Sequence, residues 1–390
     1  MSFQMYVPTR ILFGPGQLDQ LGKLKLPGKK ALIVISNGKS TRANGSLDRT
    51  ERLLREAGAE TAVFDRIEAN PLRTTVMEGS AFAREQNCDF IVALGGGSVM
   101  DASKAIAAMA TNEGDVWDYI SGGTGGGKPI GNDPLPLIAI TTTAGTGSEV
   151  DQWGVVSNNE THEKIGFGGD DRLFPAAAIV DPELMKTVPP EFTAYQGFDA
   201  LLQAVECYVS SYASLMSDMY AITAIENIGA YLAKAVRNGS DLEAREHVAF
   251  ANTLSGVVMT VSATTSEHSL EHAMSAFHQN LPHGAGLIML CVSYFTHFIE
   301  KHASDGRYVR MAQALGMKDA TDPKDFIFML EKLKMDCGVA DLKMSDYGIT
   351  KEELPAIAKK ARETMGGLFT SDLIPVTDED STAILARAYR

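Results

Sequence analysis

The sequence has few of the features that direct a chain into a membrane or a disulfide framework. No uninterrupted apolar run is long enough to span a bilayer, and the start MSFQMYVPTRILFGPG lacks the basic and apolar regions of a signal peptide. The cysteines are widely spaced and form no C-x-x-C pair: Cys88, Cys207, Cys291 and Cys337. We therefore expect reduced thiols, no membrane partner and a cytoplasmic location.

Positive charge is also scarce. The chain carries 49 acidic and 35 basic residues, so its formal net charge is −14. This excess of negative charge disfavours nucleic acid and anionic membrane surfaces as partners. The chain has 390 residues, and single cores stop growing at roughly 250–300 residues. We therefore expect two domains.

Short apolar runs alternate with helical stretches in the first half of the chain. The runs KALIVIS, TAVFD, DFIVALGGG and PLIAITTT predict a parallel sheet covered by helices on both faces. From about residue 191 onward, long segments have apolar residues at helical spacing and few strand-like runs. Paired prolines after Val188 break regular structure. We predict an α/β dinucleotide-binding domain over residues 1–188 and an all-helical metal and substrate domain over residues 189–390.

Two glycine-rich turns follow apparent strands. In DFIVALGGGSVMDASKAIA, residues 89–107, glycines let the backbone approach a bound group, and the free amides at the helix start favour a phosphate or pyrophosphate. A turn that needs glycine only for its dihedrals is the alternative. Neither G-x-G-x-x-G nor G-x-x-x-x-G-K-[ST] occurs here, so a dinucleotide would bind on a variant scaffold. A second turn, ITTTAGTGSEVD at residues 140–151, predicts a shared crevice at the carboxyl ends of parallel strands.

Four of the eight histidines lie in EHSLEHAMSAFHQNLPHG, residues 267–284. His268 and His272 stand four residues apart, so a helix would project both from one face. Imidazole is the commonest metal ligand, but H-E-x-x-H is absent, and satisfied surface or core histidines are the alternative. In QGFDALLQAVECY, Asp199 and Gln203 share one helix face and add a carboxylate and an amide, unless Asp199 caps the helix start.

These motifs, in this order, resemble the iron-containing alcohol dehydrogenase family over nearly the whole chain. The collinear matches are PTRILFGPGQLDQLG, EANP, GGGSVMDASKAIA, NEGDVWDY, TTAGTGSEV, HEKIGFG, IVDPEL, GFDALLQAVECYVS, LPHGAG, IPVTDED and ILARAY. The resemblance implies an α/β, Rossmann-like nucleotide-binding domain followed by an all-α domain, a plan shared with dehydroquinate synthase and glycerol dehydrogenase. It implies an NAD(P)-dependent oxidoreductase that transfers hydride between nicotinamide and a small alcohol, aldehyde or ketone, and a homo-oligomer, a dimer or larger.

The resemblance also assigns site residues. The nucleotide site that it implies consists of Asn70, Gly96, Gly97, Ser98, Asp101, Thr142, Thr143, Thr146 and Lys164. The metal site that it implies, for Fe²⁺ or alternatively Zn²⁺, consists of Asp199, Gln203, His268 and His283. His272 matches a position beside the nicotinamide and the substrate, and it is the candidate to relay a proton because imidazole titrates near neutrality. His278 lies in a segment one residue longer than is usual in the family, so its role stays open.

Gln203 departs from the family pattern, which has a histidine at this position. A glutamine carbonyl oxygen can ligate, but it suits Fe²⁺ or Zn²⁺ less well than an imidazole nitrogen. We therefore expect weaker affinity, a shifted metal preference or a lost metal. The alternative functions are a maleylacetate-reductase-like or other metal-independent oxo-acid reductase, and a non-catalytic nucleotide-binding protein with a degraded metal site.

The choice between the two nicotinamide cofactors depends on the segment VISNGKSTRANG. Ser36, Asn37 and Gly38 occupy the region where NAD-specific relatives often carry an aspartate, and Lys39 and Arg42 follow. Because no acid is present for the ribose 2′-hydroxyl, we predict a preference for NADP(H) over NAD(H). The alternative is that both basic side chains are solvated loop charges.

Overall fold

The chain forms two compact units in the computed structural model, which describes residues 3–390. The sheet unit consists of residues 7–143 and 147–187. The helical unit consists of residues 3–6, 144–146 and 188–390. The short segment 144–146, inside the second glycine-rich turn, thus belongs with the helices. A domain boundary after residue 188 stays a prediction.

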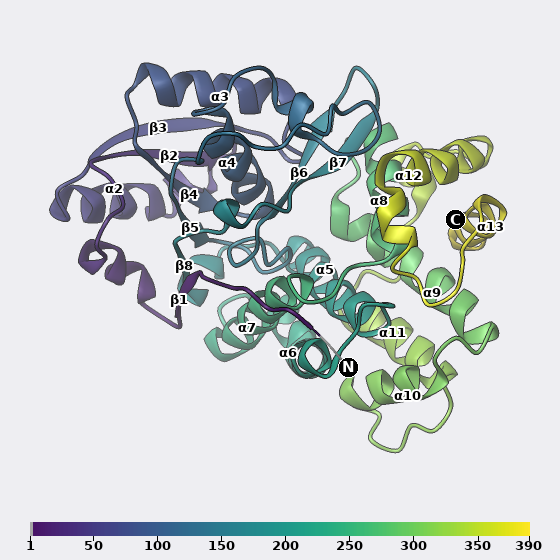
Figure 1. Cartoon of the computed structure of the whole chain (residues 1–390). Helices are drawn as coiled ribbons and strands as arrows, with labels where there is room; N and C mark the ends of the chain where they lie inside the picture. Colours follow the sequence, from purple (N-terminus) through teal and green to yellow (C-terminus); the bar gives the residue numbers. More distant parts are fainter. Residues whose placement is uncertain (1–2) are drawn as a thin grey trace. The chain divides into compact units, whose positions relative to one another are not determined.

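The sheet unit contains a parallel sheet, as the alternating apolar runs predict (Figure 1). Its strands are β1 (Arg10–Phe13), β2 (Lys30–Ser36), β3 (Glu60–Ile67), β4 (Phe90–Gly95), β5 (Leu137–Thr141), β6 (Trp153–Asn158), β7 (Glu163–Gly168) and β8 (Ala177–Val180). Its α-helices are α1 (Ser40–Ala43), α2 (Ser46–Glu56), α3 (Arg73–Glu85) and α4 (Gly97–Met109). Six strands pair in parallel in the order β1-β8-β5-β4-β2-β3, and β6 and β7 form a separate antiparallel pair.

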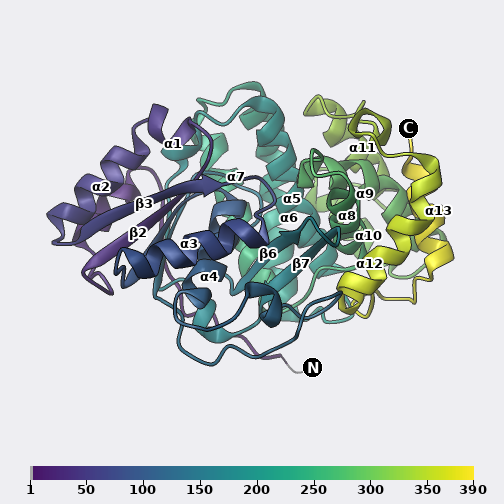
Figure 2. The same cartoon turned by 90° about the horizontal axis from the view of Figure 1, so that it is seen from above.

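Helices cover both faces of this sheet. Side chains on one face pack with α2 and with the 3₁₀ helix Gln17–Lys23 in one apolar cluster, while α3 and α4 lie on the opposite face (Figure 2). Every residue of β4 is buried, as expected for a central strand that is covered on both sides. The carboxyl ends of the parallel strands all lie at one edge of the sheet, where the first glycine-rich turn begins.

The helical unit contains nine α-helices among the described residues, and the all-helical second part that the sequence predicts is confirmed. They are α5 (Pro190–Tyr208), α6 (Leu215–Arg237), α7 (Leu242–Met259), α8 (Ser266–Phe277), α9 (His283–Glu300), α10 (Asp305–Ala314), α11 (Lys324–Asp336), α12 (Leu354–Phe369) and α13 (Asp378–Ala388). Pro190 starts α5, a position where proline sacrifices no helical hydrogen bond. Within residues 3–390, no helix combines the length and apolar character needed to cross a membrane.

Candidate metal centre and nucleotide site

Asp199 and Gln203 lie one turn apart on α5, and both side chains are buried. Nε2 of Gln203 donates a hydrogen bond to Oδ1 of Asp199 at 2.9 Å. Because α5 begins at Pro190, Asp199 lies in the interior of the helix, and the interpretation of this residue as a helix cap is wrong. A buried carboxylate in this position requires a compensating positive group.

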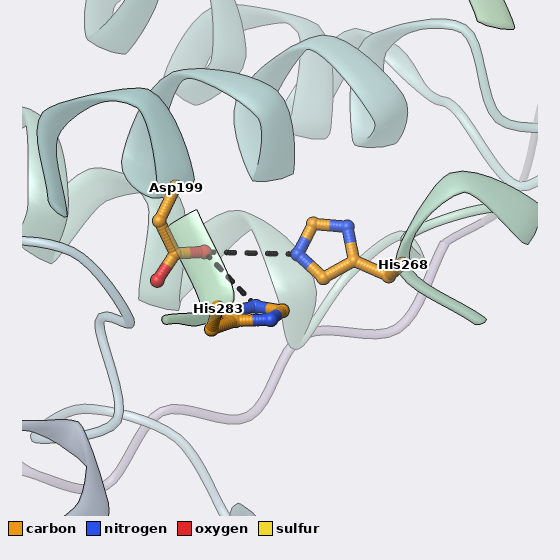
Figure 3. Close-up of side chains that lie close together, drawn as sticks. All are labelled: Asp199, His268 and His283. Atoms are coloured by element: carbon orange, nitrogen blue, oxygen red, sulfur yellow. Dashed lines mark ion pairs between the residues drawn. The ribbon is translucent and has the colours of Figure 1, made fainter. Parts of the chain in front are cut away.

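His268 on α8 and His283 at the start of α9 supply imidazoles next to this carboxylate. Nε2 of His268 lies 3.7 Å from Oδ1 of Asp199, and Nε2 of His283 lies 3.6 Å from the same oxygen. Figure 3 shows both rings directed toward Asp199. One ligand atom from each of the three residues lies within 4.8 Å of the other two. Residues that are far apart in the sequence therefore converge on one point.

The chemistry of this point fits a divalent metal. Burial disfavours the ionised form of Asp199, but the nearby His283 and His268 outweigh burial and hold the pKa of this carboxyl below its usual range. Within residues 3–390, neither Nε2 of His268 nor Oε1 of Gln203 has a hydrogen-bond partner. Buried polar atoms without partners are rare, and a cation would satisfy both. Imidazole nitrogen and carboxylate oxygen are ligands that Fe²⁺ and Zn²⁺ accept.

Two glutamates that the sequence reasoning missed lie behind the histidines. Glu206 of α5 contacts Nδ1 of His268 through Oε1, and Glu271 of α8 contacts Nδ1 of His283 through Oε2. Burial lowers the pKa of His268, but Glu206 and Asp199 outweigh it and raise this pKa well above its ordinary value. The surroundings of His268 therefore favour positive charge.

His272 lies one turn after His268 on α8 and is also buried. Its ring centroid is 5.2 Å from that of His283 and 6.3 Å from that of His268. Nδ1 of His272 lies 2.8 Å from the Met365 thioether sulfur. His272 thus lies outside the group formed by Asp199, His268 and His283, but one of its ring nitrogens lies within 4.8 Å of ligand atoms of Glu271 and His283.

His278, whose role the sequence leaves open, ends α8. Its Nε2 lies 3.4 Å from Oε2 of Glu353, in the 3₁₀ helix Lys351–Glu353. The imidazole of His278 therefore meets a carboxylate from another part of the helical unit. This contact gives His278 a structural partner that lies outside the metal group.

The first helical glycine of LPHGAG permits the approach of α9 to α5. A Cβ on Gly284 would lie 2.2 Å from the backbone oxygen of Tyr195 in α5. Real Cβ atoms do not come this close to other atoms, and a backbone atom cannot rotate away as a side chain can. Gly284 therefore allows His283 to lie next to Asp199.

We expect Gly284→Ala to lower the free energy of unfolding by about 1–3 kcal/mol, because the added methyl group must push α9 from α5. Urea unfolding measures this loss. Gly306→Ala in α10 is the control, since a Cβ there meets nothing within 4 Å, and alanine is the better helix former. Equal losses in the two variants would contradict the contact as the cause.

The first glycine-rich turn joins β4 to α4 at the carboxyl edge of the sheet. Gly97 starts α4, and Thr142 N donates to Gly95 O at 2.9 Å, so the ends of β4 and β5 adjoin. A Cβ on Gly96 would lie 2.8 Å from Oγ1 of Thr143. The structure therefore brings the turn and the threonines after β5 together, with free amides of the helix start available for an anion.

The other predicted nucleotide residues lie on different elements. Asn70 follows β3 and has a φ of 56°, a left-handed conformation that asparagine tolerates better than most residues. Lys164 is a buried residue of β7, paired with Ser157 of β6. Thr146 belongs to the helical unit, in the segment whose Gly145 lies close to Asp199: a Cβ there would be 3.2 Å from Oδ2.

Asp101, also predicted at the nucleotide site, faces a buried network inside the sheet unit. Its carboxylate accepts hydrogen bonds from Ser148 Oγ at 2.7 Å and from Val155 N at 3.0 Å. Burial raises the pKa of Asp101 to about 6. Nζ of Lys104, also fully buried, donates to Ser148 and lies 2.7 Å from Asp151. These contacts join α4 to β6 and to the loop that precedes it.

Comparison with known proteins finds two family models that match successive parts of the chain. Residues 8–182 match the family model described as iron-containing alcohol dehydrogenase, and residues 193–389 match that of the C-terminal region of the Fe-containing alcohol dehydrogenase family. The 1,3-propanediol dehydrogenase of Klebsiella pneumoniae is 34% identical over 371 residues, which is 93% of each chain.

Two further relatives extend this comparison. The NAD-dependent methanol dehydrogenase of Bacillus methanolicus is 32% identical over 92% of this chain and 93% of its own. The crystal structure of an archaeal halo-thermophilic alcohol dehydrogenase from a Red Sea brine pool superposes with a TM-score of 0.93 at 34% identity, over 100% of this chain and 99% of that chain.

Proposed function

The chain belongs to the iron-containing alcohol dehydrogenase family, and we propose that it transfers hydride between a nicotinamide cofactor and a small alcohol or carbonyl compound at a divalent metal site. The observation that carries the proposal is the convergence of Asp199, His268 and His283 on one point. The chain is an oxidoreductase of the alcohol dehydrogenase type. Its relatives do not favour the oxo-acid reductase or the non-catalytic alternative.

The proposed metal ligands are Asp199, His268, His283 and the amide oxygen of Gln203, and the proposed metal is Fe²⁺ or alternatively Zn²⁺. A bound divalent metal supplies Lewis acidity and a bound nicotinamide supplies or accepts the hydride. The side chains of Asp199, Gln203 and His268 are buried, so they would limit the access of water to a metal held here. His272, 5.2 Å from the ring of His283, is proposed to hold and relay the substrate proton.

The proposed nucleotide site uses the amides at the start of α4 for the pyrophosphate. Its residues are Asn70, Gly96, Gly97, Ser98, Asp101, Thr142, Thr143, Thr146 and Lys164. The close approach of Gly96 to Thr143 supports the part of the site at the end of β4. Asp101 would act indirectly, through the hydrogen bonds that join α4 to Ser148 and Val155.

We propose NADP(H) as the preferred cofactor over NAD(H), because no acid follows β2. Arg42, the proposed contact for the 2′-phosphate, pairs with Asp65 at 2.7 Å, and both side chains are about half exposed. Because the variant would lose the contact to the 2′-phosphate, we expect Arg42→Ala to lower kcat/KM for NADPH about tenfold, the value of one charge-assisted hydrogen bond. The kcat/KM for NADH should stay unchanged. A wild-type protein that prefers NADH would contradict the proposal.

The function is tested with a panel of alcohols, aldehydes, ketones and oxo-acids, assayed by nicotinamide absorbance. We expect at least one small alcohol or aldehyde to turn over with Fe²⁺, and kcat to fall about a hundredfold or more after chelation, because the metal contributes several kcal/mol. Added Fe²⁺ should restore the rate. Turnover of oxo-acids alone, insensitive to chelation, would instead favour the maleylacetate-reductase-like function.

We also propose that the protein is a cytoplasmic homo-oligomer, a dimer or larger. All four cysteines are free and buried, which fits a reducing compartment. Leu215 and Met219, one turn apart at the start of α6, expose 70% and 57% of their surface. An apolar pair of this kind supports association of subunits.

A further inference from the structure

Each histidine of the metal group has a buried carboxylate on the side away from Asp199. Glu206 contacts Nδ1 of His268, and Glu271 contacts Nδ1 of His283. Both carboxylate side chains are fully buried. An Nδ1–H held by a carboxylate fixes the tautomer of the ring, so that Nε2 is the ligating nitrogen. In both rings Nε2 is the atom that faces Asp199.

Glu206 is itself held in place by the chain around it. Its Oε2 accepts hydrogen bonds from the backbone N and from Oγ1 of Thr265, each at 2.7 Å. Tyr294 in turn donates its hydroxyl hydrogen to Thr265 Oγ1 at 2.9 Å. This chain of buried hydrogen bonds leaves Oε1 of Glu206 aimed at His268.

Space for Glu271 is provided by the second helical glycine of LPHGAG. A Cβ on Gly286 would lie 2.7 Å from Cγ of Glu271 and 2.9 Å from its Oε1. Gly286 therefore leaves room for the carboxylate between α8 and α9. His283 and Gly286 lie in the same first turn of α9, so one short segment supplies both the imidazole and the space for its partner.

A third buried glutamate on α8 shows that burial alone does not produce this arrangement. Glu267 is fully buried, and neither of its carboxyl oxygens has a hydrogen-bond partner within residues 3–390. Burial, and then the neighbouring Glu206, raise the pKa of Glu267 well above its usual range. Glu267 thus offers a control that matches Glu271 in residue type, helix and burial.

We propose that Glu206 and Glu271 are positioning residues that hold His268 and His283 with Nε2 toward the metal and strengthen both imidazoles as donors. This inference rests on the proposed metal function. Such partners typically contribute 10–100-fold to metal affinity. Their contribution matters more here because Gln203 supplies an amide oxygen where a third imidazole would bind more tightly.

The test compares Glu206→Gln, Glu271→Gln and the control Glu267→Gln as full-length proteins. Co²⁺ affinity is measured by competition with a chelator, together with the visible Co²⁺ spectrum and thermal unfolding of the metal-free proteins. We expect 10–100-fold weaker Co²⁺ binding and an altered spectrum for the first two variants. We expect affinity within about twofold of wild type for Glu267→Gln, because that carboxyl contacts no proposed ligand nitrogen.

Gly286→Ala gives a second test that keeps every carboxylate and imidazole. The added methyl group must displace Glu271, so Co²⁺ affinity should fall in the same direction even if Glu271→Gln does not fold. Unchanged affinity in Glu271→Gln, or in Gly286→Ala where the former is unfolded, would overturn the inference. A wild type with two Co²⁺ equivalents, of which Glu271→Gln loses one, would also overturn it, because Glu271 would then be a ligand.

The proposed function and this inference fail in different ways. Wild-type protein that binds no Co²⁺ and turns over no substrate with metal would overturn the metal function and the inference with it. Metal-dependent turnover in wild type, combined with unchanged Co²⁺ affinity in the glutamine variants, would overturn the inference alone. The affinity measurement needs no turnover, so the two results are independent.

Discussion

Asp199→Ala is expected to abolish stoichiometric metal binding and to lower kcat/KM for the best substrate by about a thousandfold or more. Asp199 is the one carboxylate of its metal group, and its Oδ1 is the atom that both His268 and His283 face. Loss of Lewis-acid stabilisation worth about 4 kcal/mol corresponds to a factor of roughly a thousand in rate. Metal content after purification without chelators, and steady-state kinetics on the same samples, measure the two effects.

Gln203→His is the companion variant on the same face of α5. It replaces a neutral amide oxygen by an imidazole nitrogen, a better ligand for Fe²⁺ or Zn²⁺. We expect its metal occupancy to exceed that of wild type. Full occupancy in both proteins would contradict weaker affinity as the consequence of Gln203, and normal turnover by Asp199→Ala would contradict the proposed metal site itself.

The central strands of the sheet could be predicted because each is a continuous apolar run between turn residues. β2, β4 and β5 are of this kind, and their parallel pairing follows from the helices between them. β1 and β8 have four residues each, and β1 is partly exposed. Runs this short resemble loop segments in the sequence, because they are strands only through pairing with distant partners.

Part of the metal group could be predicted from helical spacing. Asp199 and Gln203, like His268 and His272, share a helix face by their spacing alone. Glu206 continues the buried face of Asp199 and Gln203 by one more turn, so the same rule could have identified it. Glu271 could not be identified in this way, because its partner His283 comes from another helix and its space depends on Gly286.

His272→Ala is expected to lower kcat by about a hundredfold, a typical contribution of general acid or base catalysis, while the dissociation constant of the nicotinamide cofactor stays unchanged. His272 is buried beside His283 but is not in the group with Asp199. Its Nδ1 faces the thioether of Met365, a weak acceptor, so a proton exchanged with substrate is expected at Nε2. Stopped-flow turnover and fluorescence titration with the cofactor measure the two quantities separately.

His278→Ala is the matched control for this variant. It removes an imidazole at the C-terminal end of the same helix, where the ring pairs with Glu353. Its kcat should therefore stay near the wild-type value. Metal content must be measured for both variants, since His272→Ala should retain the metal if its role is proton transfer. Loss of metal from His272→Ala would make it a ligand, and unchanged kcat would remove His272 from the mechanism.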